Sequence, residues 1–282
     1  MKIARIELEL HWGFSVRPFP GSASQPSYLV PPLTTVFGAL ARAYSWCFEK
    51  SFAEIRLESG RVVSATKKFI DAFGAPYVAI GLFSGEGEDE EAPPLVRVSQ
   101  IVRTFTGHYQ AKVNIDQWAQ RRVLSEAFGP YSFGYTMCNH GRMYLYIAPE
   151  NGVEIPRCCL WSLTRLGSKE SIVSVNRVDT LQCTELEEVE SGTVENVIAS
   201  FFREWCEPVD PYYIEETTLA PESVDDWIHL LSLSIETRFV PPQKLVVVPR
   251  KPIAVEVKRR VRVCRLEIDG KIFSLIIPGE RS

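Results

Sequence analysis

A short loop between two apolar segments carries residue types that could hold a phosphate group. The loop, RLGSKES from Arg165 to Ser171, combines one glycine with two cations and two hydroxyls. Glycine lets the backbone approach a ligand with its N–H groups, while an Arg grips phosphate through two N–H groups and a Lys adds a point charge. Composition alone favours an ordinary exposed turn, and Glu170 argues against a simple anion site. The candidate residues are Arg165, Gly167, Ser168 and Lys169.

Charge is segregated along the chain, although the net charge is only −4. The stretch from Leu95 to Arg122 holds five Lys or Arg residues against Asp116 alone, and Lys244 to Lys271 holds nine against three acids. By contrast, Glu185 to Asp226 has thirteen acids and one basic residue. Such asymmetry predicts separate basic and acidic faces, the first suited to phosphates and the second to a protein partner or solvent. The alternative is that these runs are only solvated surface.

The sequence lacks the marks of the common enzyme classes. It has no GxGxxG, GxxxxGK[ST], HExxH or GxSxG motif, which argues against the usual nucleotide cofactors, P-loop chemistry, zincin hydrolysis and nucleophile-elbow catalysis. Its histidines stand far apart, and its aspartates form no compact cluster for a two-metal nuclease. We therefore expect no catalytic residue, no metal and no cofactor.

Composition indicates a globular chain with a sizeable core. The 282 residues are 45% apolar and 23% charged, and no apolar run approaches the roughly 20 residues that span a bilayer. The N-terminus alternates as a strand does, so we expect a soluble, cytoplasmic protein. Seven cysteines without a CxxC pair fit neither a zinc ribbon nor a secreted disulfide framework, and they predict buried or inert thiols.

Hydrophobic periodicity predicts alternating strands and helices over the first two thirds of the chain. Strand-like runs occur at 3–16, 77–83, 96–105, 142–148 and 172–181. Helical spacing occurs at 32–48, 65–73 and 115–128. Thr34 and Thr35, in the first turn of the first helix, could offer hydroxyls and free N–H groups to a phosphate, or could simply cap their own helix.

The last third carries two further signals. From Val194 to Trp205, apolar residues fall at helical spacing behind Thr193 as the N-cap, which predicts an amphipathic helix. Near the end, two alternating runs are joined by Asp269-Gly270, the strongest short-range hairpin signal. The whole order predicts an α+β fold in which helices back an antiparallel sheet, the ferredoxin-like or RRM arrangement.

Two segments resemble the Cas-five (Cas5) family of CRISPR-associated RAMP proteins. PPLTTVFGALARAY, from Pro31 to Tyr44, resembles the proline-rich entry to that family's first helix. LTRLGSKESIVSV, from Leu163 to Val175, resembles a loop and strand of the archaeal, type I-A members. The two segments and the spacing between them cover the first two thirds of the chain. The part after Glu190 resembles the family poorly and lacks the late glycine-rich loop of many RAMP proteins.

The resemblance implies a fold, a role and partners. The fold is a ferredoxin-like/RRM (RAMP) domain over 1–190 with a long basic insertion, or thumb, at about 95–135, followed over 191–282 by a β-rich extension with a helix and a β-hairpin. The role is a non-catalytic subunit of the type I effector complex Cascade, which anchors the 5′ handle of the CRISPR RNA in antiviral defence. It would cap the backbone (Cas-seven) subunits and contact the large subunit, with the small subunit and the helicase-nuclease as further partners and no membrane.

The resemblance also implies that the basic stretches bind RNA. Cations of the thumb would meet phosphates, and Tyr109 or Trp118 could stack on a splayed base, while Arg165 and Lys169 would face RNA phosphates or a partner. The thumb candidates are Arg97, Arg103, His108, Lys112, Arg121 and Arg122.

Two other functions stay open. One is a metal-independent endoribonuclease that matures precursor CRISPR RNA, which needs a base near the 2′-hydroxyl and cations around the scissile phosphate. His108, Tyr109 and Lys112 are the candidates for that chemistry. The type I-A resemblance argues against it, because that branch implies a separate processing enzyme. The other is a protein-only adaptor that uses the acidic stretch from Glu185 to Asp226.

Overall fold

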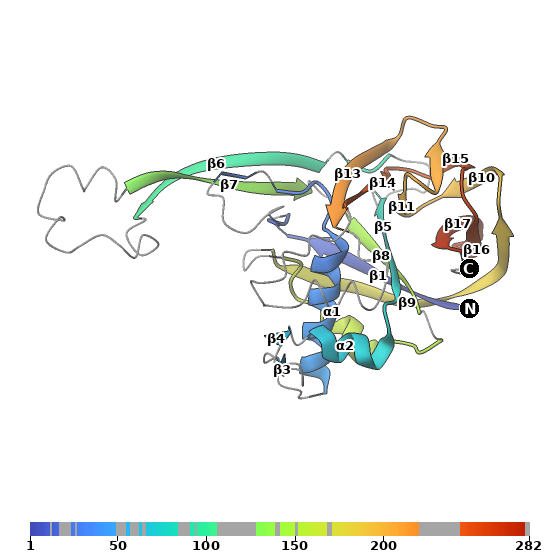
Figure 1. The fold of residues 1–282 in the computed structure, drawn as a ribbon, viewed down its shortest axis with the longest axis horizontal. Helices are drawn as coiled ribbons and strands as arrows, with labels where there is room; N and C mark the ends of the chain where they lie inside the picture. Colours follow the sequence, from blue (N-terminus) through green and yellow to red (C-terminus); the bar gives the residue numbers. More distant parts are fainter. Residues whose placement is uncertain are drawn as a thin grey trace, which may run out of the picture.

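The structure is a computed structural model, and it shows a sheet-rich fold with few helices from which one long hairpin projects (Figure 1). The residues that the structure describes are 1–11, 13–16, 24–25, 27–48, 55–56, 62–63, 66–83, 91–93, 95–105, 128–138, 142–149, 152–167, 171–219 and 243–279.

The helices of the described ranges lie in the first two thirds of the chain. They are α1 (Leu33–Cys47), α2 (Thr66–Phe73) and α4 (Arg157–Trp161). The predictions of α1 and α2 are confirmed to within a residue or two, and α1 begins directly after Pro32, as its proline entry suggested. None of these helices has the length and apolar character needed to cross a bilayer.

Strands make up most of the fold. The strands of the first half are β1 (Lys2–Leu10), β2 (Ser24–Gln25), β3 (Ile55–Arg56), β4 (Val62–Val63), β5 (Tyr77–Phe83), β6 (Leu95–Phe105), β7 (Phe128–Cys138) and β8 (Arg142–Ala148). Those of the second half are β9 (Val173–Val189), β10 (Gly192–Val197), β11 (Phe201–Phe202), β12 (Cys206–Pro208), β13 (Tyr213–Leu219), β14 (Gln243–Pro249), β15 (Ile253–Val257), β16 (Val261–Ile268) and β17 (Lys271–Pro278).

A nine-stranded sheet organises the molecule in the order β12-β15-β10-β17-β16-β9-β1-β8-β5. The long strand β9 joins its two halves, because its first part pairs with β1 and its second part, from Cys183, pairs with β16. Smaller sheets, β11-β14-β13 and β2-β7-β6, lie beside it. The expected boundary at residue 190 falls in the turn between β9 and β10, and the division into domains stays a prediction.

The two faces of the sheet bury different cores. On one face, Ile6 and Leu8 of β1 pack with Leu40 of α1 and Phe69 of α2. On the other, Ile3 and its neighbours pack with the strands of the C-terminal half. Alternation along β1 therefore serves both faces, as a period of two requires. Past Ile3, the second face carries charged side chains, among them Arg5 and Glu7.

The predicted helix from Val194 to Trp205 is wrong. This segment forms strand β10, which pairs with β15 and β17, and then the short strand β11. The physical reason is a bulge: the register shifts between Val194 and Val197, and Asn196 has a φ of 56°. An extra residue lets positions three apart point to the same side, so a bulged strand mimics helical spacing.

Of two local predictions, the C-terminal hairpin is confirmed and the length of the first strand is wrong. The Asp269-Gly270 hairpin is confirmed, because Ile268 pairs with Lys271 and the two turn residues have φ values of 50° and 81°. The first strand, by contrast, ends at Leu10 rather than running to 16. The predicted helix at 115–128 lies outside the described residues except for Phe128, which begins β7.

The expectation of inert, unpaired thiols is also wrong for four cysteines. Cys47 pairs with Cys158 and Cys183 pairs with Cys264, with Cα atoms 6.2 and 5.5 Å apart. Their separations of 111 and 81 residues in sequence hide both pairs from any argument about local spacing. Packing of α1 on α4, and of β9 on β16, brings them together.

Candidate nucleic-acid interface

The hairpin of β6 and β7 extends well beyond the rest of the fold (Figure 1). The two strands pair without interruption from Leu95 opposite Cys138 to Phe105 opposite Phe128. Near the middle of β7, Ser24 pairs in parallel with Ser132 and adds a third strand. The hairpin occupies the predicted insertion at about 95–135.

The base of this hairpin is anchored by a segment that follows β1. Phe14 and Thr136 of β7 exchange two backbone hydrogen bonds, of 2.9 and 2.8 Å. Ser15 donates its hydroxyl to the carbonyl oxygen of Gly134 at 2.8 Å. The backbone N–H of Tyr28 donates to the carbonyl oxygen of Val16 at 3.0 Å, which ties the approach to α1 to the same place. We call residues 13–16, 27–28 and 134–136 together the hairpin base.

The Arg165 loop docks on the hairpin base. Its two sides close as a short antiparallel turn, in which Arg165 bridges Ile172 and Leu166 donates its N–H to the carbonyl oxygen of Ser171 at 2.9 Å. The hydroxyl of Ser171 in turn accepts a hydrogen bond of 3.0 Å from the N–H of Ser15. Leu166 is buried whereas Arg165 is exposed, so the turn is held by its apolar residue and presents its cation to solvent.

Two glycines make this packing feasible. A Cβ on Gly13, whose φ is 78°, would lie 1.9 Å from the carbonyl oxygen of Thr136. A Cβ on Gly167, whose φ is 112°, would lie 2.7 Å from Cγ2 of Val16. Both positions therefore need glycine for conformation and for space. Gly167, expected to admit a phosphate, instead lets the loop approach the chain's own segment 15–16.

One residue predicted to contact RNA, Arg97, is paired with a carboxylate of the same chain. Arg97 of β6 forms an ion pair with Glu216 of β13, which also accepts the N–H of Leu29 at 2.6 Å. Burial, together with this carboxylate, raises the pKa of the Tyr28 phenol above its ordinary value. Arg97 is still partly exposed, with 41% of its side chain accessible, so it can turn toward a phosphate only by weakening the pair with Glu216.

The structure brings together only some of the predicted site residues. Arg97, Arg165 and Gly167 gather around the hairpin base, and Arg103 lies on β6 farther along the hairpin. Thr34 and Thr35 lie half-buried in the first turn of α1, whose N-cap is Pro32. Six predicted residues lie outside the described residues: His108, Lys112, Arg121, Arg122, Ser168 and Lys169.

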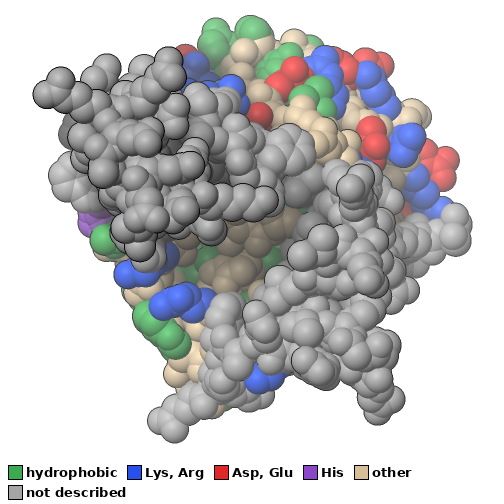
Figure 2. Space-filling view, turned by 60° about the vertical axis from the view of Figure 1, so that its left-hand side comes forward, with side chains coloured by type: hydrophobic (Ala, Val, Ile, Leu, Met, Phe, Trp, Pro, Cys, Tyr) green, Lys and Arg blue, Asp and Glu red, His purple; other side chains and the backbone are tan. Residues whose placement is uncertain are grey.

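The expectation of separate basic and acidic faces is wrong for the C-terminal half. The acidic run from Glu185 and the basic run from Lys244 belong to neighbouring strands and turns and pair with one another. The pairs include Lys244 with Glu204, Lys258 with Glu207, and Arg260 with Glu188. Figure 2 shows the result as Lys or Arg side chains interspersed with acids in its upper right part. Unlike Arg97, Arg165 takes part in no ion pair with any residue that the structure describes.

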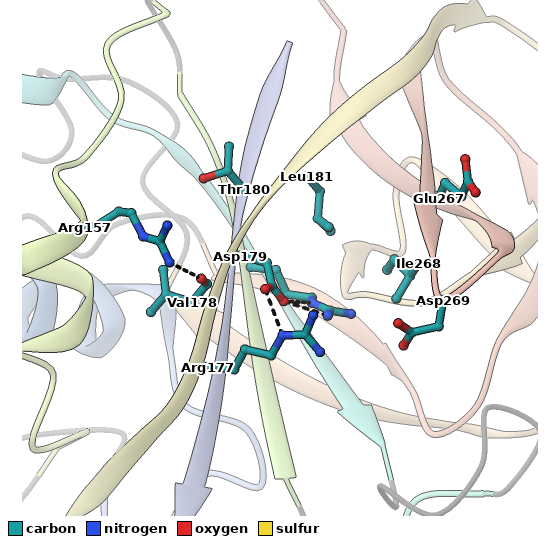
Figure 3. A pocket seen from close by; sticks show the side chains of 10 residues that line it. Arg157, Arg177, Val178, Asp179, Thr180, Leu181, Glu267, Ile268 and Asp269 are labelled. Atoms are coloured by element: carbon teal, nitrogen blue, oxygen red, sulfur yellow. Dashed lines mark hydrogen bonds and ion pairs between the residues drawn. The ribbon is translucent and has the colours of Figure 1, made fainter.

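A shallow pocket of about 400 Å³ lies away from the hairpin base, between β9, β1 and the β16–β17 turn (Figure 3). Asp179 accepts hydrogen bonds from Arg5 at 2.7 Å and from Arg177 at 2.8 Å. Burial of Asp179 opposes the charge, but the hydrogen bonds from Arg5 and Arg177 outweigh it and hold its pKa below the ordinary value. Arg157 adds a third cation to the lining, and Glu267 and Asp269 add two more acids, so its charges balance and offer no net attraction to an anion.

Sequence reasoning missed the residues that assemble the hairpin base. Ser15, Ser27 and Thr136 are small polar residues with no motif around them. Ser15 and Thr136 each make a hydrogen bond between segments remote in sequence, and Ser27 accepts one from the N–H of Val16. Gly13 gave no signal either, because it falls on the alternate face of the apolar series Leu10, Trp12 and Phe14 and leaves that pattern intact.

Comparisons with known proteins give a consistent result. No family model matches the chain. It is 27% identical over 237 residues to "CRISPR-associated protein Cas5 2" of Saccharolobus solfataricus, which covers 83% of this chain and 80% of that protein. It is 25% identical over 187 residues to "CRISPR system aCascade subunit Cas5 1" of the same organism, covering 64% of this chain and 65% of that one. A crystal structure of a CRISPR protein from Archaeoglobus fulgidus matches with a TM-score of 0.52 at 20% identity, over 99% of this chain and 100% of that chain; this likeness bears on the fold alone.

Proposed function

Since the chain belongs to the Cas5 family of CRISPR-associated proteins, we propose that it is a non-catalytic RNA-binding subunit of a type I-A Cascade complex. In this role it anchors the 5′ handle of the guide RNA and caps the row of backbone subunits. The large subunit is its other principal neighbour, and the small subunit and the helicase-nuclease join the same assembly. One relative carries the name of an aCascade subunit, which supports this assignment.

The observation that carries the proposal is the docking of the Arg165 loop on the hairpin base. Ser15 bonds to both partners, to Ser171 in the loop and to Gly134 in β7. An exposed Arg165, which has no ion-pair partner among the described residues, is therefore fixed beside a long projecting hairpin. A single RNA strand needs such a combination, in which cations follow its backbone and an extended surface takes its bases.

The strand order supports a ferredoxin-like (RAMP) unit within the fold. The four strands β9-β1-β8-β5 are antiparallel neighbours, with α1 and α2 following β1 and α4 lying between β8 and β9. A ferredoxin-like domain has this order of four strands, and the hairpin of β6 and β7 is then an insertion between its second and third strands. Such an insertion can contact RNA without disturbing the sheet that supports it.

Binding to handle RNA tests the proposal. We expect the chain, with its backbone partner, to prefer handle RNA over a scrambled RNA of equal length. Its affinity should fall steeply with salt, because each phosphate contact releases counterions. Arg165→Ala should weaken binding by about 1–3 kcal/mol and reduce the log–log salt slope by about 0.7. Arg259→Ala is the matched control, because Arg259 is also an exposed arginine but lies in the turn between β15 and β16.

Two outcomes would contradict the proposal. Equal affinity for handle and scrambled RNA would remove the specific role, and equal effects of Arg165→Ala and Arg259→Ala would show that only overall charge matters. The non-catalytic part has its own test. Precursor RNA should stay intact on long incubation with the protein in EDTA, and cleavage there would instead favour a metal-independent ribonuclease.

A further inference from the structure

Three cysteine sulfurs meet where the end of α1 packs on α4. The Sγ atoms of Cys47, Cys158 and Cys159 all lie within 4.8 Å of one another. Cys47 and Cys158 form a disulfide, whereas Cys159 keeps a free thiol. The proposed RNA-binding role uses none of them, although adjacent cysteines on one short helix that both reach a third are an unusual arrangement for packing alone.

We propose that, after reduction of the disulfide, this cluster binds one soft metal ion, Zn²⁺ or Cu⁺, through three thiolates. The reductant is a dithiol: it gives two electrons and two protons to the disulfide, which yields thiols at Cys47 and Cys158 and a disulfide in the reductant. The ion then displaces one proton from each of the three thiols. Oxidised and metal-bound forms are thus alternative ways to tie α1 to α4.

The geometry of the sulfurs fits such an ion. Thiolates about 2.3 Å from a tetrahedral Zn²⁺ lie roughly 3.8 Å from one another, so a cluster within 4.8 Å needs only small side-chain movements. Thiolates select soft ions such as Zn²⁺ and Cu⁺ over Mg²⁺ or Ca²⁺, which prefer oxygen. Among the described residues, no carboxylate or imidazole joins the group, so its donors are sulfur alone.

The burial of the three residues suits entry and retention of an ion. Cys158 is exposed and gives access from solvent, Cys47 is partly buried, and Cys159 is fully buried among core side chains. An ion held by these three residues would be reached from solvent through Cys158 and enclosed by the core on the Cys159 side.

Metal titration of the reduced, full-length chain tests the inference. The protein is reduced with a phosphine, freed of it under nitrogen and titrated with Cd²⁺, whose bonds to thiolates absorb in the ultraviolet; Zn²⁺ is then added as a competitor. We expect one tightly bound ion per chain. Cys158→Ser should weaken binding by about a hundredfold or more, and its exposed position keeps the fold intact. Oxidised protein should bind no Cd²⁺, because two ligands are tied up.

Two controls separate this cluster from the other cysteines. Cys206→Ala removes the other buried free thiol of the described residues, and Cys264→Ala breaks the second disulfide pair; both should bind Cd²⁺ as the wild type does. The inference is overturned if reduced wild type shows no thiolate absorption at one equivalent, or if Cys158→Ser binds as tightly as wild type. Circular dichroism of each variant shows whether its fold is intact, so that a loss of binding can be assigned to the lost ligand.

Discussion

Replacing Gly167 with alanine should loosen the Arg165 loop by an amount that the structure allows us to divide into two parts. The new Cβ would lie 2.7 Å from Cγ2 of Val16 and 3.3 Å from the carbonyl oxygen of Ser15. It would also force an L-residue to adopt a φ of 112°. The backbone strain costs about 1–3 kcal/mol, and the overpacking adds about 1–3 kcal/mol. We expect Gly167→Ala to lower the free energy of unfolding by about 2–6 kcal/mol.

Gly192→Ala is the matched control for the backbone part. Gly192 has the same φ of 112°, but a Cβ there would meet nothing within 4 Å. The difference between the two alanine variants therefore measures the contact with segment 15–16. Because the closest atom is the end of a side chain, Val16→Ala should relieve that contact, and the double variant should recover about 1–2 kcal/mol relative to additivity.

Urea denaturation of the four variants and the wild type measures these terms, and RNA titration of the same proteins links them to function. Either of two results would contradict the docking of the loop. If Gly167→Ala cost no more than Gly192→Ala, or if Val16→Ala recovered nothing in the double variant, the loop would not be docked on the hairpin base. The main structural support for the proposed RNA surface would then be lost.

Further predictions concern the same fold. Gly13→Ala should cost more than about 4 kcal/mol in denaturant titrations, because its Cβ would lie 1.9 Å from the backbone oxygen of Thr136, which no side-chain substitution can move away. Cys47→Ser should lower the melting temperature by roughly 10 °C in thermal scans, since loss of a crosslink spanning 111 residues restores conformational entropy to the unfolded chain worth about 5 kcal/mol. Reduction without metal should lower it further, because it also breaks the disulfide between Cys183 and Cys264. The lowered pKa of Asp179 contributes stability that is present above the ordinary value of 3.8 and is lost as pH falls through the folded-state value. Asp179→Asn should therefore flatten the acid limb of stability against pH in denaturant titrations, and an unchanged limb would contradict this.

Local patterns predicted the parts of the fold that local forces determine. The proline entry located α1, the apolar run at 77–83 located β5, and Asp269-Gly270 located the last hairpin, because each signal lies within a few residues of the structure it specifies. The helix predicted from Val194 was wrong, since a bulge in a strand produces the same three-residue spacing of apolar residues as a helix. The pairing of β10 with β15 and β17, which decides the matter, connects residues far apart in sequence.

The candidate interface could be predicted only in fragments. Arg97 and Arg165 stood out by charge, but only one of them forms an ion pair with a described residue. No spacing in the sequence reveals that difference. Glu216, from a strand more than a hundred residues away, forms an ion pair with Arg97, whereas Arg165 forms no ion pair with a described residue. The acidic and basic runs of the C-terminal half similarly pair across neighbouring strands and turns. Charge counts along a chain therefore overestimate the charge that a folded surface presents.

The role of Gly167 shows how the structure changes the interpretation of a mutation. If this glycine served a phosphate directly, Gly167→Ala and Arg165→Ala would weaken RNA binding together and leave stability alone. Docked as it is against Val16, Gly167 acts through the position of the loop, so its replacement should lower stability and RNA affinity together. Arg165→Ala, on an exposed side chain, should lower affinity and the salt slope with stability unchanged. Restoring the loop with Val16→Ala should then restore RNA affinity in the Gly167→Ala background but never in the Arg165→Ala background.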